Sequence, residues 1–183
     1  MIIKKILNVI LLLILFSNSA HSTEQNQLDY LFEKLKLDNE TSARETEMKI
    51  WSIWTTHPKK QNLTNLLSRG TSFMNKKQYQ VAEDIFSTVI ELDPNWAEAW
   101  NKRATVLYFM GKYKESQNDI DEVLNLEKRH FGALSGQGLV QIKLENFEKA
   151  LRSYEQVEQI YPSMISPKIM IPQIKEMIKN QSV

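Results

Sequence analysis

Histidine is the side chain best suited to proton transfer or metal binding near neutral pH, and this sequence has three, at His21, His57 and His130. His57 and His130 each stand beside a predicted helix junction, and neither has a metal-ligand partner at short spacing. We therefore predict no catalytic residue, no metal ligand and no cofactor-binding residue. An enzyme would need a ligand-stabilised pocket around His57 or His130.

Three glycines give the pattern Gly-x-x-x-Gly-x-Gly at Gly132, Gly136 and Gly138. A dinucleotide-binding glycine loop follows a β-strand and opens a helix. Here the glycines lie inside a predicted helix that follows another helix, so the pattern does not predict a nucleotide site.

The elements that carry these groups recur with a period of 34 residues. Four sets of similar residues keep this spacing: Tyr79, Tyr113 and Phe147; Ala82, Ser116 and Ala150; Phe86, Ile120 and Tyr154; Val89, Val123 and Val157. Such a period predicts a repeated helical hairpin. We place the repeats at residues 63–96, 97–130 and 131–164.

This block resembles the tetratricopeptide repeat (TPR) family, whose signature combines aromatic, small and apolar residues with a closing proline. In the middle repeat the matching residues are Trp100, Ala104, Leu107, Tyr113, Ser116 and Ile120. The resemblance implies an all-α fold, a right-handed α-solenoid of three TPR helix hairpins. We expect an N-terminal helical hairpin and turn at 23–62 and a C-terminal capping helix at 165–183.

Two features of the predicted scaffold concern large or charged side chains. Trp51 and Trp54 share one helix face, and we expect them to seal the exposed apolar end of the stack, with ligand binding as the alternative. We also expect Arg103 to form a salt bridge with Asp119 across its own hairpin, half exposed and of little energetic value.

The N-terminal residues predict export. Lys4 and Lys5 precede an apolar run, and the small residues Ala20 and Ser22 suit a signal peptidase, so we predict a signal peptide at 1–22 and a mature start at Thr23. The chain has no cysteine. Cleavable export without disulfides indicates a bacterial periplasm, with a membrane contact only through an uncleaved signal.

The net charge argues against nucleic acid as a partner. The whole chain carries a formal charge of +1, and loss of the two lysines with the signal peptide changes it to −1. Nucleic-acid affinity depends mainly on phosphate neutralisation by Lys and Arg. A nearly neutral mature chain therefore indicates no nucleic-acid partner.

In the TPR family the first helix of each pair builds the concave wall that faces a bound peptide or protein. Carried over to this sequence, the resemblance implies these binding residues: Thr71, Asn101, Lys102, Thr105, Tyr108, Phe109, Gly132, Ser135, Gly136, Leu139 and Lys143. One subgroup grips a terminal carboxylate with a clamp of Lys, Asn and Arg. Only Asn101 and Lys102 match that clamp here.

Gly132 and Gly136 lie four residues apart on the inward face of a predicted helix, where each costs roughly 0.8–1 kcal/mol relative to alanine. One interpretation is a flat floor approached by the backbone of a partner, with Tyr108 and Phe109 as an aromatic wall. The other is internal packing, by the preceding helix or by the C-terminal helix around Ile174.

These observations predict an adaptor that offers its concave face to a protein or an extended peptide segment. The wider match looks like a group of alphaproteobacterial periplasmic TPR proteins, which implies a scaffold in the cell envelope without known chemistry. The alternative is a structural subunit that forms an oligomer or joins an envelope complex through its outer helix faces.

Overall fold

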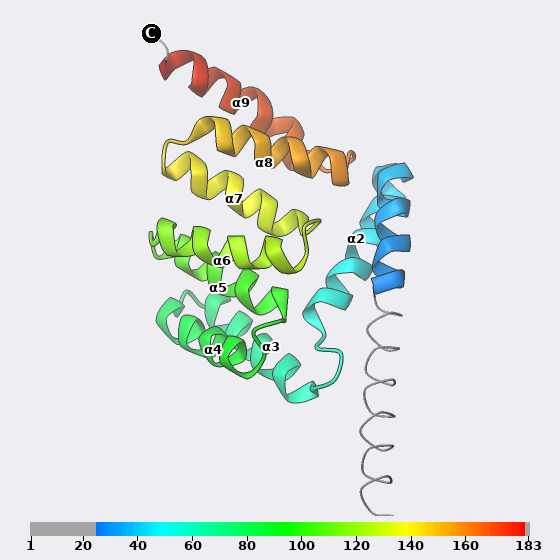
Figure 1. Ribbon diagram of the computed structural model, residues 1–183, viewed down its shortest axis with the longest axis vertical. Helices are drawn as coiled ribbons and strands as arrows, with labels where there is room; N and C mark the ends of the chain where they lie inside the picture. The colour runs from blue at the N-terminus through cyan, green and yellow to red at the C-terminus, as the bar shows by residue number, and fades with distance from the viewer. Residues whose placement is uncertain (1–24, 182–183) are drawn as a thin grey trace, which may run out of the picture.

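The computed structural model describes residues 25–181, and over this range the chain is all-α (Figure 1). The predicted signal peptide at 1–22 and the predicted mature start at Thr23 lie outside the described residues. The first helix covers residues 25–37. It is followed by α2 (Glu40–Thr55), α3 (Gln61–Asn75), α4 (Tyr79–Leu92), α5 (Ala97–Phe109), α6 (Tyr113–Leu126), α7 (Phe131–Lys143), α8 (Phe147–Ile160) and α9 (Ile165–Gln181).

Helices α3 to α8 form three hairpins that stack side by side, so the predicted α-solenoid is confirmed (Figure 1). Helices α4, α6 and α8 begin at Tyr79, Tyr113 and Phe147, the aromatic residues of the 34-residue period. Within the described residues, no helix combines the length and the apolar character that crossing a membrane requires.

The turn inside each hairpin contains one residue in the left-handed region, at the same repeat position. These residues are Lys77 (φ 59°), Gly111 (φ 76°) and Glu145 (φ 60°). In each turn the next amide donates to a carbonyl five residues earlier, as in the bond from Lys112 N to Leu107 O at 2.9 Å. This pattern closes the first helix of the pair and reverses the chain.

Small residues let the two helices of a hairpin approach closely. A Cβ at Gly70 would stand 2.5 Å from the Phe86 ring, and one at Gly138 would overlap the Tyr154 ring. The aromatic rings of α4 and α8 therefore fill the space beside these glycines. Arg103 pairs with Asp119 as predicted, at 2.7 Å from Nε and 2.8 Å from Nη2.

The expectation that Trp51 and Trp54 seal the end of the stack is wrong. The hairpin of the first helix and α2 lies beside the stack, next to the α7 and α8 ends (Figure 1). Trp54 lies with its ring 5.0 Å from that of Phe131, the first residue of α7. The turn after α2 directs the chain to α3, and the tryptophans pack against the start of α7, inside the stack and not at its end.

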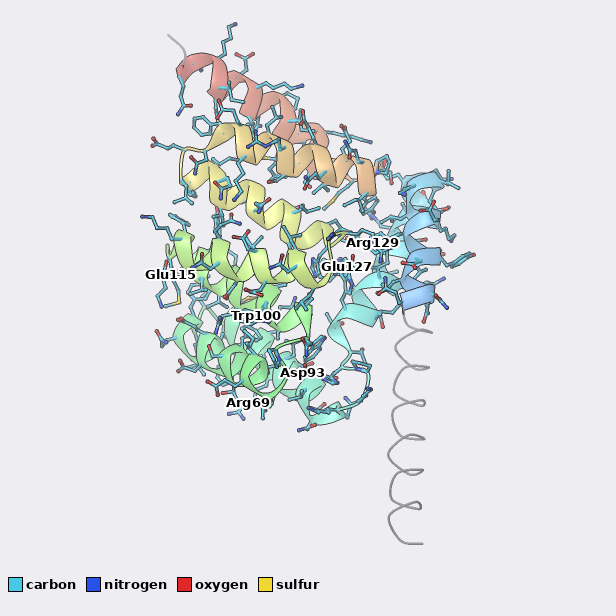
Figure 2. The ribbon with its side chains drawn as sticks, viewed as in Figure 1. Arg69, Asp93, Trp100, Glu115, Glu127 and Arg129 are labelled. Atoms are coloured by element: carbon cyan, nitrogen blue, oxygen red, sulfur yellow. The ribbon has the colours of Figure 1, made fainter. Side chains whose placement is uncertain are left out.

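Polar contacts hold this hairpin in place. Arg129 Nη1 lies 2.7 Å from Asp29 Oδ1, and its other guanidinium nitrogens bind Glu127 (Figure 2). Tyr161 donates its hydroxyl to Glu47 at 3.0 Å. Contacts therefore run from the leading hairpin to the turns that precede α7 and α9.

Helix α9 packs on α8, at the end of the stack formed by the third hairpin (Figure 1). Its buried Ile174 joins a cluster with Ala150 and Tyr154 of α8. The atoms nearest to a Cβ built on Gly132 belong to Trp51 and His130, and the one nearest to a Cβ on Gly136 belongs to Ile120, so none comes from α9. The C-terminal helix therefore does not cover the glycine floor, which removes one of the two internal-packing explanations.

Candidate functional site

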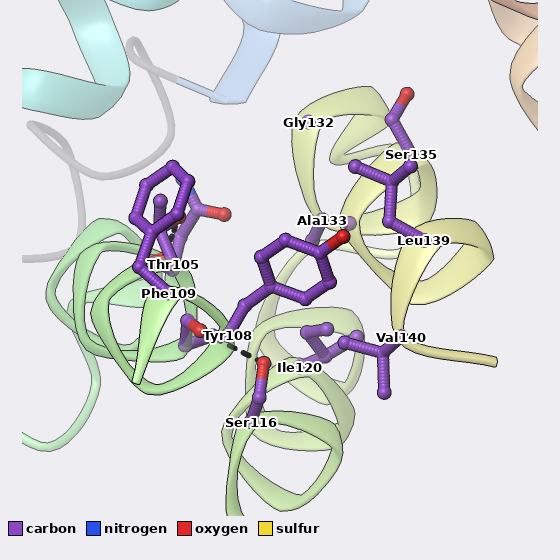
Figure 3. Close-up of a pocket in the computed structure, with 13 residues that line it drawn as sticks. Thr105, Tyr108, Phe109, Ser116, Ile120, Gly132, Ala133, Ser135, Leu139 and Val140 are labelled. Atoms are coloured by element: carbon purple, nitrogen blue, oxygen red, sulfur yellow. Dashed lines mark hydrogen bonds between the residues drawn. The ribbon is translucent and has the colours of Figure 1, made fainter. Parts of the chain in front are cut away.

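A pocket of about 260 Å³ opens between α5 and α7, with α6 beneath it (Figure 3). The residues that line it come from these three helices: Asn101, Ala104, Thr105, Tyr108, Phe109, Ser116, Ile120, Gly132, Ala133, Ser135, Gly136, Leu139 and Val140. None of them carries a charge. The pocket is an apolar recess on the side of the stack formed by the first helices of the second and third repeats.

Aromatic rings form one side of this pocket. The Tyr108 ring stands between α5 and the α7 residues Ala133 and Leu139 (Figure 3). The Phe109 ring packs against that of Tyr108 at 5.9 Å and stacks on that of Tyr79 at 5.6 Å. Phe109 is nevertheless 54% exposed and Leu139 is 38% exposed. Large apolar surface left in water at a recess is typical of a binding surface.

Gly136 forms part of the floor of the pocket. A Cβ built on Gly136 would meet only Ile120 Cδ1, at 3.8 Å, which is ordinary contact distance. Ser116 donates its hydroxyl to the carbonyl of Ala104 at 2.8 Å, so the polar atom in the floor is already satisfied. Nothing in the packing requires glycine at position 136.

Gly132 differs from Gly136, although both lie on the inward face of α7. A Cβ at Gly132 would come within 2.7 Å of the Trp51 ring. Helix α2 of the leading hairpin therefore occupies the space above Gly132, so the packing there is internal but comes from neither of the two helices that the sequence suggested. Gly132 therefore accommodates the chain's own leading hairpin, whereas Gly136 faces the pocket.

A buried polar network lies beside the pocket, at the N-terminal ends of α5 and α7. The carboxylate of Glu98, at 1% exposure, lies 3.1 Å from His130 Nε2 and 2.9 Å from Lys102 Nζ. Asn101 donates to the same carboxylate at 2.9 Å. The Trp54 ring stacks on the His130 ring with centroids 3.9 Å apart.

These contacts determine the charge state of Glu98. Burial alone would raise the pKa of its carboxyl, but the hydrogen bond from His130 and the charge of Lys102 outweigh burial and lower this pKa. His130 accepts the amide of Ala133 on Nδ1 at 3.1 Å, which leaves Nε2 to donate to Glu98. His130 thus caps α7 and positions Glu98.

His57 has a comparable structural role. Its Nδ1 accepts the amides of Lys59 and Lys60, and its Nε2 lies 2.8 Å from Asp93 Oδ2. Burial would raise the pKa of Asp93, but hydrogen bonds from His57 and from the amide of Asn95 lower it. His57 therefore joins the turn after α2 to the end of α4.

Among the described residues, His, Asp and Glu side chains form no group of three or more that could hold a metal ion. The two described histidines each pair with one carboxylate from a distant part of the sequence, His57 with Asp93 and His130 with Glu98. Both rings are buried and their nitrogens are engaged. Neither histidine lines the pocket.

The structure brings most of the predicted concave-face residues together. Eight line the pocket: Asn101, Thr105, Tyr108, Phe109, Gly132, Ser135, Gly136 and Leu139. Thr71 and Lys102 line a second hollow of about 380 Å³, near the end of α2. Lys143 is exposed at the last residue of α7 and lines neither recess.

Several lining residues were not foreseen from the sequence. Ala104, Ser116 and Ile120 were assigned to the scaffold, and the structure places them at the floor. The equivalent scaffold residues of the third repeat, such as Gly138 and Tyr154, are in tight contact. Because the same repeat position is open in one hairpin gap and filled in another, periodicity could not identify them.

Comparison with known proteins identifies the family. A tetratricopeptide repeat model matches residues 97–130, and a second such model matches residues 133–163. A TPR repeat-containing protein of Rhizobium etli is 32% identical over 145 residues, which span 79% of this chain and 71% of that protein. The chain belongs to the tetratricopeptide repeat family. Its predicted resemblance to alphaproteobacterial TPR proteins is likewise supported by this relative.

Other relatives and solved structures match shorter parts of the chain. A DnaJ homolog subfamily C member 7 homolog of Dictyostelium discoideum is 27% identical over 97 residues, which span 51% of this TPR chain and 18% of that protein. The first TPR of Spaghetti (RPAP3), solved with an HSP90 peptide, superposes with a TM-score of 0.63 at 20% identity, over 65% of this chain and 94% of that one. MamA superposes with a TM-score of 0.60 at 22% identity, over 63% of this chain and 67% of that one.

Proposed function

We propose that this TPR protein is an adaptor that binds a protein or an extended peptide through the recess between α5 and α7. The observation that carries the proposal is the uncovered apolar pocket, with Phe109 and Leu139 exposed at its edge. A few anchor residues, among which aromatic side chains are enriched, supply most of the binding energy in protein interfaces. The similar TPR domain of Spaghetti was solved with a bound peptide, which supports the same use here.

Loss of binding after truncation of the aromatic wall tests this function. A displayed library of random peptides, selected on purified residues 23–183, supplies ligands, and fluorescence anisotropy gives their dissociation constants. We expect Tyr108→Ala and Phe109→Ala each to weaken binding by about tenfold or more, as truncation of a central aromatic contact does. The proposal would be contradicted if no peptide is selected, or if both variants bind the selected peptides as tightly as the wild type does.

We also propose that the protein acts outside the cytoplasm of a bacterium, in the cell envelope. The support is the charged and apolar start of the sequence followed by small residues, together with the absence of cysteine. N-terminal sequencing of the protein from a bacterial envelope fraction tests this location. A start at Thr23 agrees with cleavage, whereas an intact Met1 in the cytoplasmic fraction contradicts it.

A second candidate function is assembly through the outer helix faces. Leu92 and Leu126 end the second helices of the first two repeats at 51% and 41% exposure, and Ile165 and Ile169 of α9 are 50% and 52% exposed. Where such residues form one contiguous patch, the patch favours a contact with another chain. Light scattering across a concentration series separates the two: a monomer favours the adaptor and a concentration-dependent oligomer favours assembly.

A further inference from the structure

We propose that the pocket between α5 and α7 takes one large apolar side chain from an uncharged, internal stretch of an extended partner, and that it does not take a terminal carboxylate. This inference rests on the proposed peptide-binding function and specifies its ligand. Three features of the described residues support it: the charge of the pocket, the engagement of the neighbouring polar groups, and the shape of the floor.

The charge of the pocket argues against an acidic ligand. Its lining contains no lysine, arginine or histidine, and all of its polar side chains are uncharged. A carboxylate brought into such a recess loses its hydration without gaining a cation. An apolar side chain gains from the same surroundings, by about 25 cal/mol for each Å² of apolar surface removed from water.

Lys102 and Asn101 are already used by the chain itself, whereas the Ser135 hydroxyl in the lining has no hydrogen-bond partner among the described residues. Lys102 Nζ lies 2.9 Å from the buried carboxylate of Glu98 and 5.6 Å from the centre of the Trp51 ring. Asn101 donates its amide to the same carboxylate. Release of Lys102 toward a ligand would leave Glu98 with one partner fewer in a buried position, which is costly. The two residues that could hold a carboxylate therefore hold Glu98.

The leading hairpin also covers the part of α7 next to these groups. Trp51 stands over Gly132, in the first turn of α7, whereas Gly136 one turn later remains open. A partner on this face therefore meets Gly136, Leu139 and the Tyr108 ring first. Trp51 therefore restricts the approach of a polar ligand group to the N-terminal end of α7.

The shape of the floor fits one side chain and a close backbone. A volume of about 260 Å³ is large enough for a leucine, methionine or phenylalanine side chain and too small for a folded element. Gly136 has no side chain, and its nearest neighbour across the floor is Ile120 Cδ1. An extended segment can therefore lie against α7 while one of its side chains enters between Tyr108 and Val140.

A peptide selection with two matched libraries tests the inference. One library holds random decapeptides with an acetylated N-terminus and an amidated C-terminus, and the other holds the same lengths with a free carboxylate. We expect ligands from the amidated library, with leucine, isoleucine, methionine or phenylalanine enriched at one position. Replacement of that residue by alanine in the selected peptide should weaken binding at least tenfold.

Variants of the protein locate the bound side chain. Gly136→Leu fills the pocket and should weaken binding at least tenfold, while the melting temperature stays at or above that of the wild type. Leu126→Ala is the control outside the pocket. Leu126 lies on α6 and is about as exposed as the pocket residue Leu139, and its truncation should leave affinity unchanged. Lys102→Met should also change affinity less than twofold.

Three outcomes would overturn the inference, and they separate it from the function on which it rests. Ligands found only in the free-carboxylate library, or a tenfold loss in Lys102→Met with none in Gly136→Leu, would show peptide binding by a carboxylate clamp. Enrichment of acidic residues at the pocket position would show the wrong ligand class. If neither library yields a ligand, the peptide-binding function itself fails.

Discussion

The indole of Trp51 occupies the space that a side chain at Gly132 would need. A Cβ there would come within 2.7 Å of Cη2 and 3.1 Å of Cζ2 of that ring. Trp51 packs edge-on against the rings of Trp54, His130 and Phe131, so it has little freedom to move aside. This contact joins the leading hairpin to the third repeat, and it explains one of the two inward glycines of α7.

Alanine at the two glycines should therefore have opposite effects. At Gly132 overpacking costs about 1–3 kcal/mol, which exceeds the helix propensity of about 1 kcal/mol gained on replacing glycine, so the free energy of unfolding should fall. Gly136→Ala should raise it by up to about 1 kcal/mol. Urea denaturation measures the free energy of unfolding of both variants. Equal stabilisation at the two sites would show that Trp51 does not pack on Gly132.

The left-handed residues of the hairpin turns make a second prediction. Lys77 and Glu145 adopt φ values of 59° and 60°, where the middle repeat has Gly111. A side chain costs about 1–2 kcal/mol in this conformation, partly offset by the flexibility that glycine gives the unfolded chain. Lys77→Gly and Glu145→Gly should each raise the free energy of unfolding, and Gly111→Ala should lower it.

Thermal unfolding of these three variants checks the turn geometry. Lys77→Ala and Glu145→Ala are the controls, because they remove the side chain but keep the Cβ in the left-handed region. They should change stability much less than the glycine variants. Stabilisation of the alanine variants to the same extent would point to side-chain charge and not to backbone conformation.

Glu98 should make the stability of the protein depend on acidity. Its pKa lies below the ordinary value of 4.5 because His130 and Lys102 overcome its burial. The unfolded chain therefore takes up this proton more readily than the folded protein. The contribution of ionised Glu98 to the free energy of unfolding is complete above pH 4.5. It is lost as the pH falls through the lower pKa of the folded protein.

Glu98→Gln isolates this effect. At pH 7 the variant should be less stable by about 1–3 kcal/mol, since it loses hydrogen bonds and an ion pair made by a buried charge. The difference from the wild type should shrink as the pH is lowered below 4.5. Urea denaturation between pH 7 and pH 3 measures it, and a constant difference would mean that Glu98 is not the titrating group.

The ion pair of Arg103 and Asp119 should contribute more than the small value expected from the sequence. Both guanidinium contacts are short, and side-chain exposure is 22% for Arg103 and 6% for Asp119. A double-mutant cycle with alanine at both positions should give a coupling energy of about 1–3 kcal/mol. Ser87 also accepts a hydrogen bond from this guanidinium, at 3.1 Å.

An exposed pair in the same chain supplies the comparison. Lys36 and Glu33 lie 2.9 Å apart on the first helix, with side-chain exposures of 46% and 72%. Their cycle should give about 0.2–0.5 kcal/mol. A coupling between Arg103 and Asp119 no larger than this would show that burial does not strengthen the pair.

Much of the fold follows from residues that repeat along the sequence. The 34-residue spacing of Tyr79, Tyr113 and Phe147 predicts the starts of α4, α6 and α8, because each hairpin must bury the same apolar face against its neighbour. The predicted pair of Arg103 and Asp119 lies within one hairpin, where local geometry determines it. The departures from the carboxylate clamp are also visible in the sequence.

Only the tertiary structure decided what covers each part of the concave face. Trp51 is 81 positions from Gly132 in the sequence, and Glu98 is 32 positions from His130, so no repeat rule relates them. The leading hairpin could have packed on the first repeat or beside the later ones. The aromatic contacts of Trp54 with His130 and Phe131 place it beside the later ones, and this leaves Gly136 and its apolar surroundings open.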